Sequence, residues 1–257
     1  MNVPINGYRA ASAIWQDHLS EVLSSLGFRR CVLEPCAYRN DDTDVDGLNH
    51  GDDLLVTGPR EQLVKLKAGA SAKLVCSSSD IVSPDPQDAK VLRFLKREIT
   101  CDPALGWLYE ADKKHADEMI QRCGLTEEAK SCVTPGVQET LEWTTEEERD
   151  VFDPKLTPDD EIAWRGIGGV GQFLAGDRLD IKYATKEALR DAGTPRESSW
   201  KKLKRIARYL LHARRMQIIY IWQKKRRGLR AGCDASHAGC PRTRKAPPGS
   251  SRSSGAT

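Results

Sequence analysis

The stretch that decides the fold is His50-Gly51-Asp52-Asp53-Leu54-Leu55-Val56, where two adjacent carboxylates follow a glycine and lead directly into an apolar segment. A glycine in front of an apolar run is typical of a tight turn followed by a strand. Adjacent aspartates repel each other, and a cation or a nearby positive charge is the usual reason for holding them together. The stretch therefore predicts a β-hairpin that presents Asp52 and Asp53 as metal ligands.

Apolar residues upstream of this hairpin recur at three- and four-residue spacing, which predicts an amphipathic helix over residues 10–26 that ends at Gly27. An extended stretch over residues 31–39 and an acidic loop over residues 41–46 precede the turn. Strands and helices that do not alternate strictly indicate an α+β fold. The remaining expected elements are strands at 54–57, 91–100 and 107–109, helices at 60–68, 116–123, 167–174 and 200–211, a loop at 77–87 and an acidic flexible connector at 139–161.

Composition places the chain among globular proteins with room for one large domain or two small ones, since it has 257 residues, 39% of them hydrophobic and 30% charged. No apolar run approaches the length that spans a bilayer. The first residues lack the charged and apolar blocks of a signal peptide, so an intracellular location, cytoplasmic or nuclear, is expected. The eight cysteines include no CxxC pair, which favours unpaired thiols, most of them buried.

The net charge of +3 conceals a strong asymmetry along the chain. Residues 1–195 carry 23 Lys and Arg against 35 Asp and Glu, while residues 196–257 carry 17 against 2, which together give the 40 and 37 of the whole chain. A basic block of this density can bind phosphates by releasing counterions. A solvated helix face followed by a disordered tail explains the same charge equally well.

Several motifs occur in a fixed order along the chain. They are Gly7-Tyr8-Arg9 with Trp15, His50 to Leu54, Phe94 to Ile99, Tyr109 to Leu125, Thr134-Pro135, Trp164 to Ala184, Trp200 to Leu210 and Asp234 to Cys240. In this order they resemble the Pol polyprotein of copia-type long-terminal-repeat retrotransposons, over its reverse transcriptase region and the start of its ribonuclease H. The resemblance covers nearly the whole chain.

The resemblance implies RNA-directed DNA polymerisation by two-metal phosphoryl transfer with Mg²⁺ or Mn²⁺. Asp52 and Asp53 match the carboxylates of the catalytic hairpin, and Asp234 matches the first metal-binding carboxylate of ribonuclease H. The other essential aspartate of the family lies on an earlier palm strand that nothing here matches. We therefore expect a truncated chain that cannot polymerise deoxynucleotides alone and that depends on the remaining Pol segments.

The same resemblance implies an RNA or DNA template–primer as partner and no membrane partner. The residues expected to contact that nucleic acid are basic and lie at the two ends of the reverse transcriptase region: Arg9, Lys201, Lys202, Lys204, Arg205 and Arg208. The fold expected is a partial polymerase palm, an antiparallel sheet with packed helices, followed by a mainly helical thumb or connection region and a disordered basic tail. The corresponding segments are a partial palm (1–75), its continuation toward the thumb (76–138), an acidic linker (139–161), a basic helical connection (162–230), and a ribonuclease H stub with the tail (231–257).

Three alternatives remain open from the residues alone. Residues 42–53 fit much of an EF-hand calcium loop, although Asn49 and Asp53 stand where an apolar residue and a glutamate are expected and the flanks read as strands. The basic helix that begins near Trp200 could bind nucleic acid without any catalysis. Finally, Asp52 and Asp53 could cap a turn and bind nothing.

Overall fold

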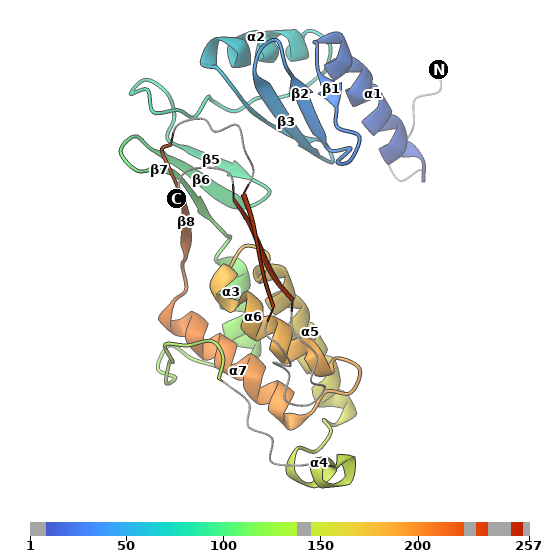
Figure 1. Ribbon diagram of the computed structural model, residues 1–257, viewed down its shortest axis with the longest axis vertical. Helices are drawn as coiled ribbons and strands as arrows, with labels where there is room; N and C mark the ends of the chain where they lie inside the picture. The colour runs from blue at the N-terminus through green and yellow to red at the C-terminus, as the bar shows by residue number, and fades with distance from the viewer. Residues whose placement is uncertain (1–8, 138–144, 224–229, 236–247, 254–257) are drawn as a thin grey trace. The chain divides into compact units, whose positions relative to one another are not determined.

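The computed structural model describes residues 9–137 and 145–223, and the backbone of residues 230–235 and 248–253. The chain forms two compact units, residues 1–94 and residues 95–257, which are described separately (Figure 1). Each unit combines antiparallel strands with helices, so the predicted α+β class is confirmed. No described helix has the length and apolar character needed to cross a membrane.

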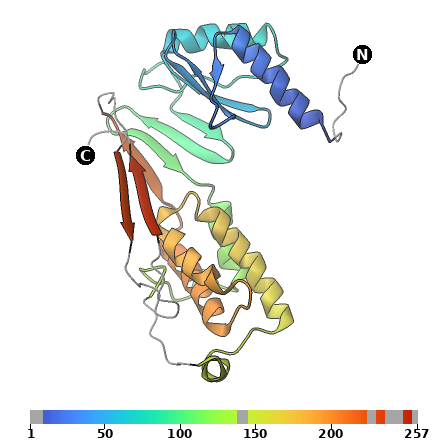
Figure 2. The same ribbon diagram turned by 45° about the vertical axis from the view of Figure 1, so that its right-hand side comes forward.

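The first unit places two helices on one face of a four-stranded antiparallel sheet. Helices α1 and α2 lie on the same side of it (Figures 1 and 2), and Leu19 and Leu23 of α1 pack against Tyr38 and Val45 of the sheet. Side chains alternate along β3, where Val45, Gly47 and Asn49 are buried and their neighbours are exposed, so the second face of the sheet is open. The elements are α1 (Ala11–Ser25), β1 (Arg29–Arg30), β2 (Ala37–Asn40), β3 (Val45–His50), β4 (Asp53–Thr57) and α2 (Arg60–Ser71), with the strands in sequential order.

Local sequence signals account for most of this unit. The helix predicted over residues 10–26 is α1, and Gly27 ends it with a φ of +86° that glycine adopts without strain. The loop predicted over residues 41–46 is shorter, because β3 already begins at Val45. The extended stretch predicted over residues 31–39 is interrupted by turns between β1 and β2.

The loop predicted at residues 77–87 is anchored to the start of α2 by one carboxylate. Asp88 accepts hydrogen bonds from the Arg60 guanidinium, at 2.9 and 3.0 Å, and from the Ser83 hydroxyl at 2.6 Å. The Lys90 ammonium donates to the backbone carbonyls of Ser83 and Asp88, at 2.9 and 3.1 Å, and to that of Asp85. These bonds fix the loop without regular secondary structure.

Asp88 makes the acid stability of the first unit testable. Hydrogen bonds from Arg60 and Ser83 lower the pKa of Asp88 from 3.8 to about 2. A depressed carboxyl pKa stabilises the fold above the unfolded value, and that contribution is lost as the pH falls toward the folded value. We therefore expect the difference in urea midpoint between the wild type and Asp88→Asn to be constant above about pH 4 and to shrink between about pH 4 and pH 2. The exposed Asp80, as Asp80→Asn, is the control, and an unchanged difference across that window would contradict the assignment.

The second unit joins an antiparallel sheet to a helical bundle. The sheet order is β5-β6-β7-β8, in which β5 is the last segment of residues 1–94, and the strand after the bundle, β8, returns to pair with β7. Strands β9 and β10 pair with each other. The strands are β5 (Val91–Phe94), β6 (Arg97–Asp102), β7 (Gly106–Glu110), β8 (Gln217–Ile221), β9 (Arg230–Ala235) and β10 (Pro248–Ser253), and the helices are α3 (Lys114–Arg122), α4 (Glu146–Phe152), α5 (Pro158–Leu174), α6 (Leu179–Ala188), the 3₁₀ helix η1 (Leu189–Asp191) and α7 (Glu197–His212).

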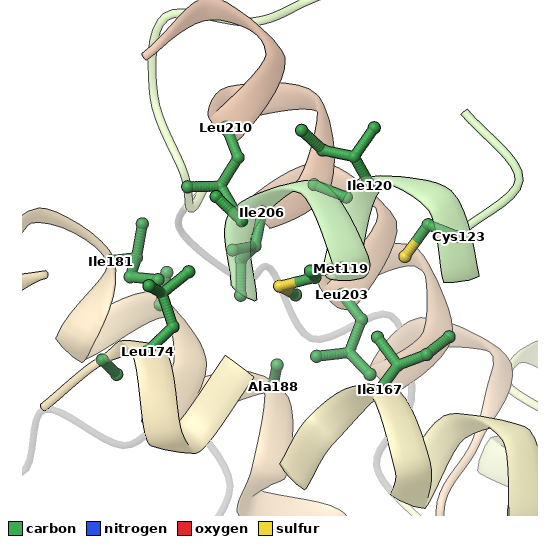
Figure 3. Close-up of a cluster of buried hydrophobic side chains, with 14 of the residues drawn as sticks. Met119, Ile120, Cys123, Ile167, Leu174, Ile181, Ala188, Leu203, Ile206 and Leu210 are labelled. Carbon is green, nitrogen blue, oxygen red and sulfur yellow. The ribbon is translucent and has the colours of Figure 1, made fainter. Parts of the chain in front are cut away.

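The core of the bundle is built by the apolar stripes that the sequence predicts. Met119 of α3, Ile167 of α5, Ile181 of α6 and Leu203 of α7 converge in Figure 3, and all four are at most 3% exposed. A half-buried polar cluster attaches the sheet to this bundle: Asp177 accepts bonds from Arg97 and Tyr109. Desolvation and that carboxylate raise the pKa of Tyr109 to about 12.

The single strand predicted over residues 91–100 is wrong, since the chain reverses in its middle. Leu95 and Lys96 have φ values of 50° and 64°, so they form the turn between β5 and β6. Side chains other than glycine and asparagine seldom adopt this conformation. The Arg97 guanidinium donates to the Leu95 carbonyl at 2.9 Å and so stabilises the turn. The residue types in this segment do not predict that contact.

The flexible connector predicted at 139–161 is also wrong for the part that the structure describes. Thr145 and Glu148 form a capping box that starts α4. The buried Arg196 donates to the carboxylates of Asp150 and Glu146, at 2.7 and 3.1 Å. Asp153 accepts from the Ser198 backbone N–H at 2.8 Å and so caps α7. The acidic residues therefore clamp the start of α7; residues 138–144 lie outside the described residues.

Several other expectations differ from the structure. The region predicted as a helical connection, 162–230, also contains the strand β8. The predicted disordered tail includes residues 248–253, which form β10 paired with β9, while residues 236–247 and 254–257 lie outside the described residues. The chain passes from one unit to the other between residues 94 and 95, inside the segment 76–138 that was expected to continue the palm toward the thumb. Cys101 and Cys123 are the buried ones among the six cysteines whose side chains the structure describes, so the expectation of mostly buried thiols is wrong for these six.

Candidate functional site

The hairpin predicted from the opening stretch is present. Strands β3 and β4 pair with His50 opposite Asp53, so the connection is the two residues Gly51 and Asp52. Gly51 has a φ of +67° at the first central position, as a type II′ turn requires. The prediction of a tight turn that carries both carboxylates is therefore confirmed.

Helix α1 fixes this turn from the buried side. The Trp15 indole N–H and the Gln16 amide both donate to the Gly51 carbonyl, at 2.9 and 3.2 Å. The Asn49 side-chain amide donates to the Gln16 side-chain oxygen Oε1 at 2.8 Å, and Asn49 itself is buried. The backbone N–H of Asn49 donates to the Cys36 carbonyl at 2.8 Å. Helix α1 and the segment that precedes β2 thus hold the turn in one position.

Both carboxylates face solvent. Leu54 and Val56 of β4 pack in the core with the helices, and side chains alternate along a strand, so Asp53 lies on the open face of the sheet. Asp52 is exposed at the tip of the turn. Among the described residues, no group of three or more His, Cys, Asp or Glu side chains is arranged to hold a metal. Mg²⁺ is commonly held by one or two carboxylates together with substrate phosphates, so this pair fits part of such a site.

The acidic loop before the hairpin does not form an EF-hand. Residues 45–50 are a strand, and strands flank the segment where an EF-hand has helices. Three of its carboxylates are bound to arginine: Arg39 contacts Asp41 and Asp46, at 3.3 and 3.0 Å, and also Asp44. Hydrogen bonds from Arg29 and Arg39 lower the pKa of Asp41. We do not retain the calcium-loop alternative.

The predicted basic face of α7 is only partly exposed. Lys201 and Arg208 are exposed, whereas Lys202, Lys204 and Arg205 are half-buried. The Arg205 guanidinium donates to the Thr134 hydroxyl at 2.8 Å, and the Lys204 ammonium lies 5.6 Å from the centre of the Trp200 ring. The five side chains therefore do not form one continuous exposed stripe.

The other predicted residues are placed as follows. Arg9 is exposed just before α1, in the same unit as Asp52 and Asp53. Asp234 belongs to β9, of which the structure describes the backbone. The structure brings Asp52 and Asp53 together in one turn, and α7 carries the five basic residues in the other unit.

Sequence reasoning missed the two polar residues behind the turn, Gln16 and Asn49. Asn49 stands in the apolar half of the β3 alternation, and a polar residue at a buried position signals a specific hydrogen bond. Its partner lies 33 residues away, so the sequence alone does not name it.

No protein-family model matches the chain, and no solved structure matches it significantly.

Proposed function

We propose that the first unit is a palm fragment of a copia-type retrotransposon reverse transcriptase, and that its hairpin is the part of the catalytic site that presents two carboxylates. The observation that carries this proposal is the turn itself, with Asp52 and Asp53 exposed on a hairpin whose other side is held by α1. A rigid turn with its acids pointing to solvent suits metal and substrate binding better than it suits a core. The motif order of the chain supports the same family.

In this proposal Asp52 and Asp53 hold a divalent cation, Mg²⁺ or Mn²⁺, whose chemistry is the stabilisation of charge on a transferring phosphoryl group. Trp15 and Gln16 position the pair by fixing the Gly51 carbonyl. Two carboxylates leave the remaining coordination positions to water, to nucleotide phosphates or to a carboxylate of another Pol segment. We therefore infer a weak metal site in the isolated chain.

The second unit takes the place of the thumb and connection, with the template–primer as its partner. Lys201 and Arg208 are the α7 members of the basic set best placed to contact phosphates, because they are exposed. The family's first catalytic aspartate has no match in this chain. The isolated chain is therefore proposed to bind metal and nucleic acid weakly and not to extend a primer.

Paramagnetic broadening by Mn²⁺ tests the hairpin directly. We expect substoichiometric Mn²⁺ to broaden the backbone amide signals of residues 50–54 before others in the first unit, because broadening falls steeply with distance from the ion. Asp52→Asn and Asp53→Asn should each weaken this effect about tenfold or more, whereas the exposed Asp80→Asn should leave it unchanged. Uniform broadening, or broadening that survives both substitutions, would refute the metal site.

A primer-extension assay on a primed RNA template with Mg²⁺ tests the catalytic part separately. No extension above background is expected from the chain alone. Efficient synthesis would contradict the proposal that the site is incomplete, and it would leave the metal-binding result to stand on its own.

A further inference from the structure

Strand β8 has an apolar edge that no described strand covers. It is the last strand in the order β5-β6-β7-β8, so one edge pairs with β7. Unpaired N–H and C=O groups at a strand edge are a template for another strand. Ile219, Tyr220 and Ile221 are 49%, 57% and 58% exposed. Residues 217–222 contain no charge and no proline, which are the usual means of protecting an edge.

This edge is held rigidly in place. The Trp222 indole N–H donates to the carbonyls of Asp102 and Pro103, at 3.1 Å each, and the Trp222 backbone N–H donates to the Leu105 carbonyl at 3.1 Å. At the other end of the strand, Arg215 is paired with Glu110 at 2.7 Å. A strand that is already ordered loses little entropy when it pairs again.

The charges beside β8 indicate what kind of strand it accepts. Arg215 is bound by Glu110, and Arg214 is bound by Glu127 and lies 3.7 Å from Asp117. An acidic peptide would therefore meet cations that already have partners. An uncharged strand of β-branched and aromatic residues would instead pack against side chains that are also uncharged and mostly apolar. Strand β8 of a second copy is such a strand.

We propose that the outer edge of β8 pairs in antiparallel orientation with β8 of a second copy, about a twofold axis through Ile219. In this register Ile219 faces its own copy, Ile218 faces Tyr220 and Gln217 faces Ile221. Each pair joins residues that lie on the same face of their strands, and apolar cross-strand pairs such as Ile219 with Ile219 and Ile218 with Tyr220 stabilise a sheet. The twofold axis closes the assembly as a dimer.

The proposal does not depend on the function of the hairpin, which lies in the other unit. The surface area that a five-residue strand pair buries is smaller than the roughly 800 Å² per partner of a standard interface, so the dimer should be weak. We expect a dissociation constant on the order of 1–100 μM. Sedimentation velocity of the full chain, over a concentration range that spans these values, measures it.

The residue on the twofold axis gives a sharp test, because a charge placed there lies directly opposite the same charge of the second copy. Ile219→Lys and Ile219→Glu should each weaken dimerisation about tenfold or more, since like charges directly opposite each other destabilise a strand pair. An equimolar mixture of the two variants should dimerise again, because lysine then faces glutamate. Failure of the mixture to recover the dimer would overturn the antiparallel register.

Two further variants test whether misfolding, rather than the charge on the axis, causes the loss of dimerisation. Ile219→Thr keeps a β-branched, uncharged side chain and should remain dimeric. Val91→Lys places a charge on the exposed Val91 of β5, the terminal strand at the other end of the sheet order, and should also remain dimeric. A wild-type chain that is monomeric at the highest concentration, or a dimer that Val91→Lys dissociates, would overturn the proposal.

Discussion

Replacing Arg178 with methionine is expected to destabilise the second unit by about 3–5 kcal/mol, because it breaks a buried ion pair and removes the guanidinium donors from Asp180 and from two backbone carbonyls. The Arg178 side chain is 2% exposed and donates to both carboxylate oxygens of Asp180, at 2.9 and 2.6 Å. It also donates to the carbonyls of Ala213 and Arg214, at 2.7 and 3.0 Å, where α7 ends. Methionine has a similar length but no donor. Native-state hydrogen exchange of the α7 amides measures the loss.

A matched surface pair controls this experiment. Arg122 is half exposed and pairs with Glu118 at 2.7 Å along α3, so Arg122→Ala should cost about 0.5 kcal/mol or less. Burial opposes ionisation of Asp180, yet hydrogen bonds from Arg178 and Tyr209 lower its pKa. The Asp180 pKa should therefore rise in Arg178→Met. Equal effects of the Arg178 and Arg122 substitutions would show that the buried pair contributes no more than a surface one.

Replacing Gly106 with alanine is expected to release β8 from the sheet and to destabilise the second unit by about 3 kcal/mol or more. Gly106 has a φ of +134°, and an added Cβ would lie 2.1 Å from the Tyr220 carbonyl oxygen and 2.9 Å from the Ile221 Cα. Both are backbone atoms of β8, which cannot move away without breaking the β7–β8 pairing. The measurement is hydrogen exchange of the β8 amides, which should lose their protection.

The same substitution elsewhere in the unit should have the opposite sign. Gly169 is exposed in the interior of α5, and a Cβ there would meet nothing within 4 Å. Gly169→Ala should therefore stabilise the unit by about 0.5–1 kcal/mol. Preserved β8 protection in Gly106→Ala would mean that the close approach of the two strands is not required for their pairing.

The parts of the fold that the sequence predicts are those that depend on local pattern. Helix α1 follows from apolar spacing and Gly27, and the hairpin follows from Gly51 before two acids and an apolar run. Each signal lies within the segment that it describes. The position of Asp52 and Asp53 was predictable for the same reason.

The parts that it does not predict depend on distant partners. Helix α4 is short and acidic, and its place is fixed by Arg196, which lies 46 residues beyond Asp150. The turn at Leu95 and Lys96 lacks the glycine or asparagine that usually announces a positive φ. The spacing of residues along α7 likewise could not predict which of its lysines and arginines are exposed, because Arg205 makes a hydrogen bond with the distant Thr134.

The return of β8 to β7 has a consequence during synthesis on the ribosome. Trp222 binds the carbonyl of Asp102, 120 residues earlier in the chain. At a synthesis rate of about 5–20 residues per second, roughly 6–24 s pass between the translation of β7 and the translation of the strand that pairs with it. Every element of the helical bundle emerges during that interval. The nascent chain thus passes through a stage in which a growing bundle carries an incomplete, aggregation-prone sheet, and a chaperone would have its greatest effect then.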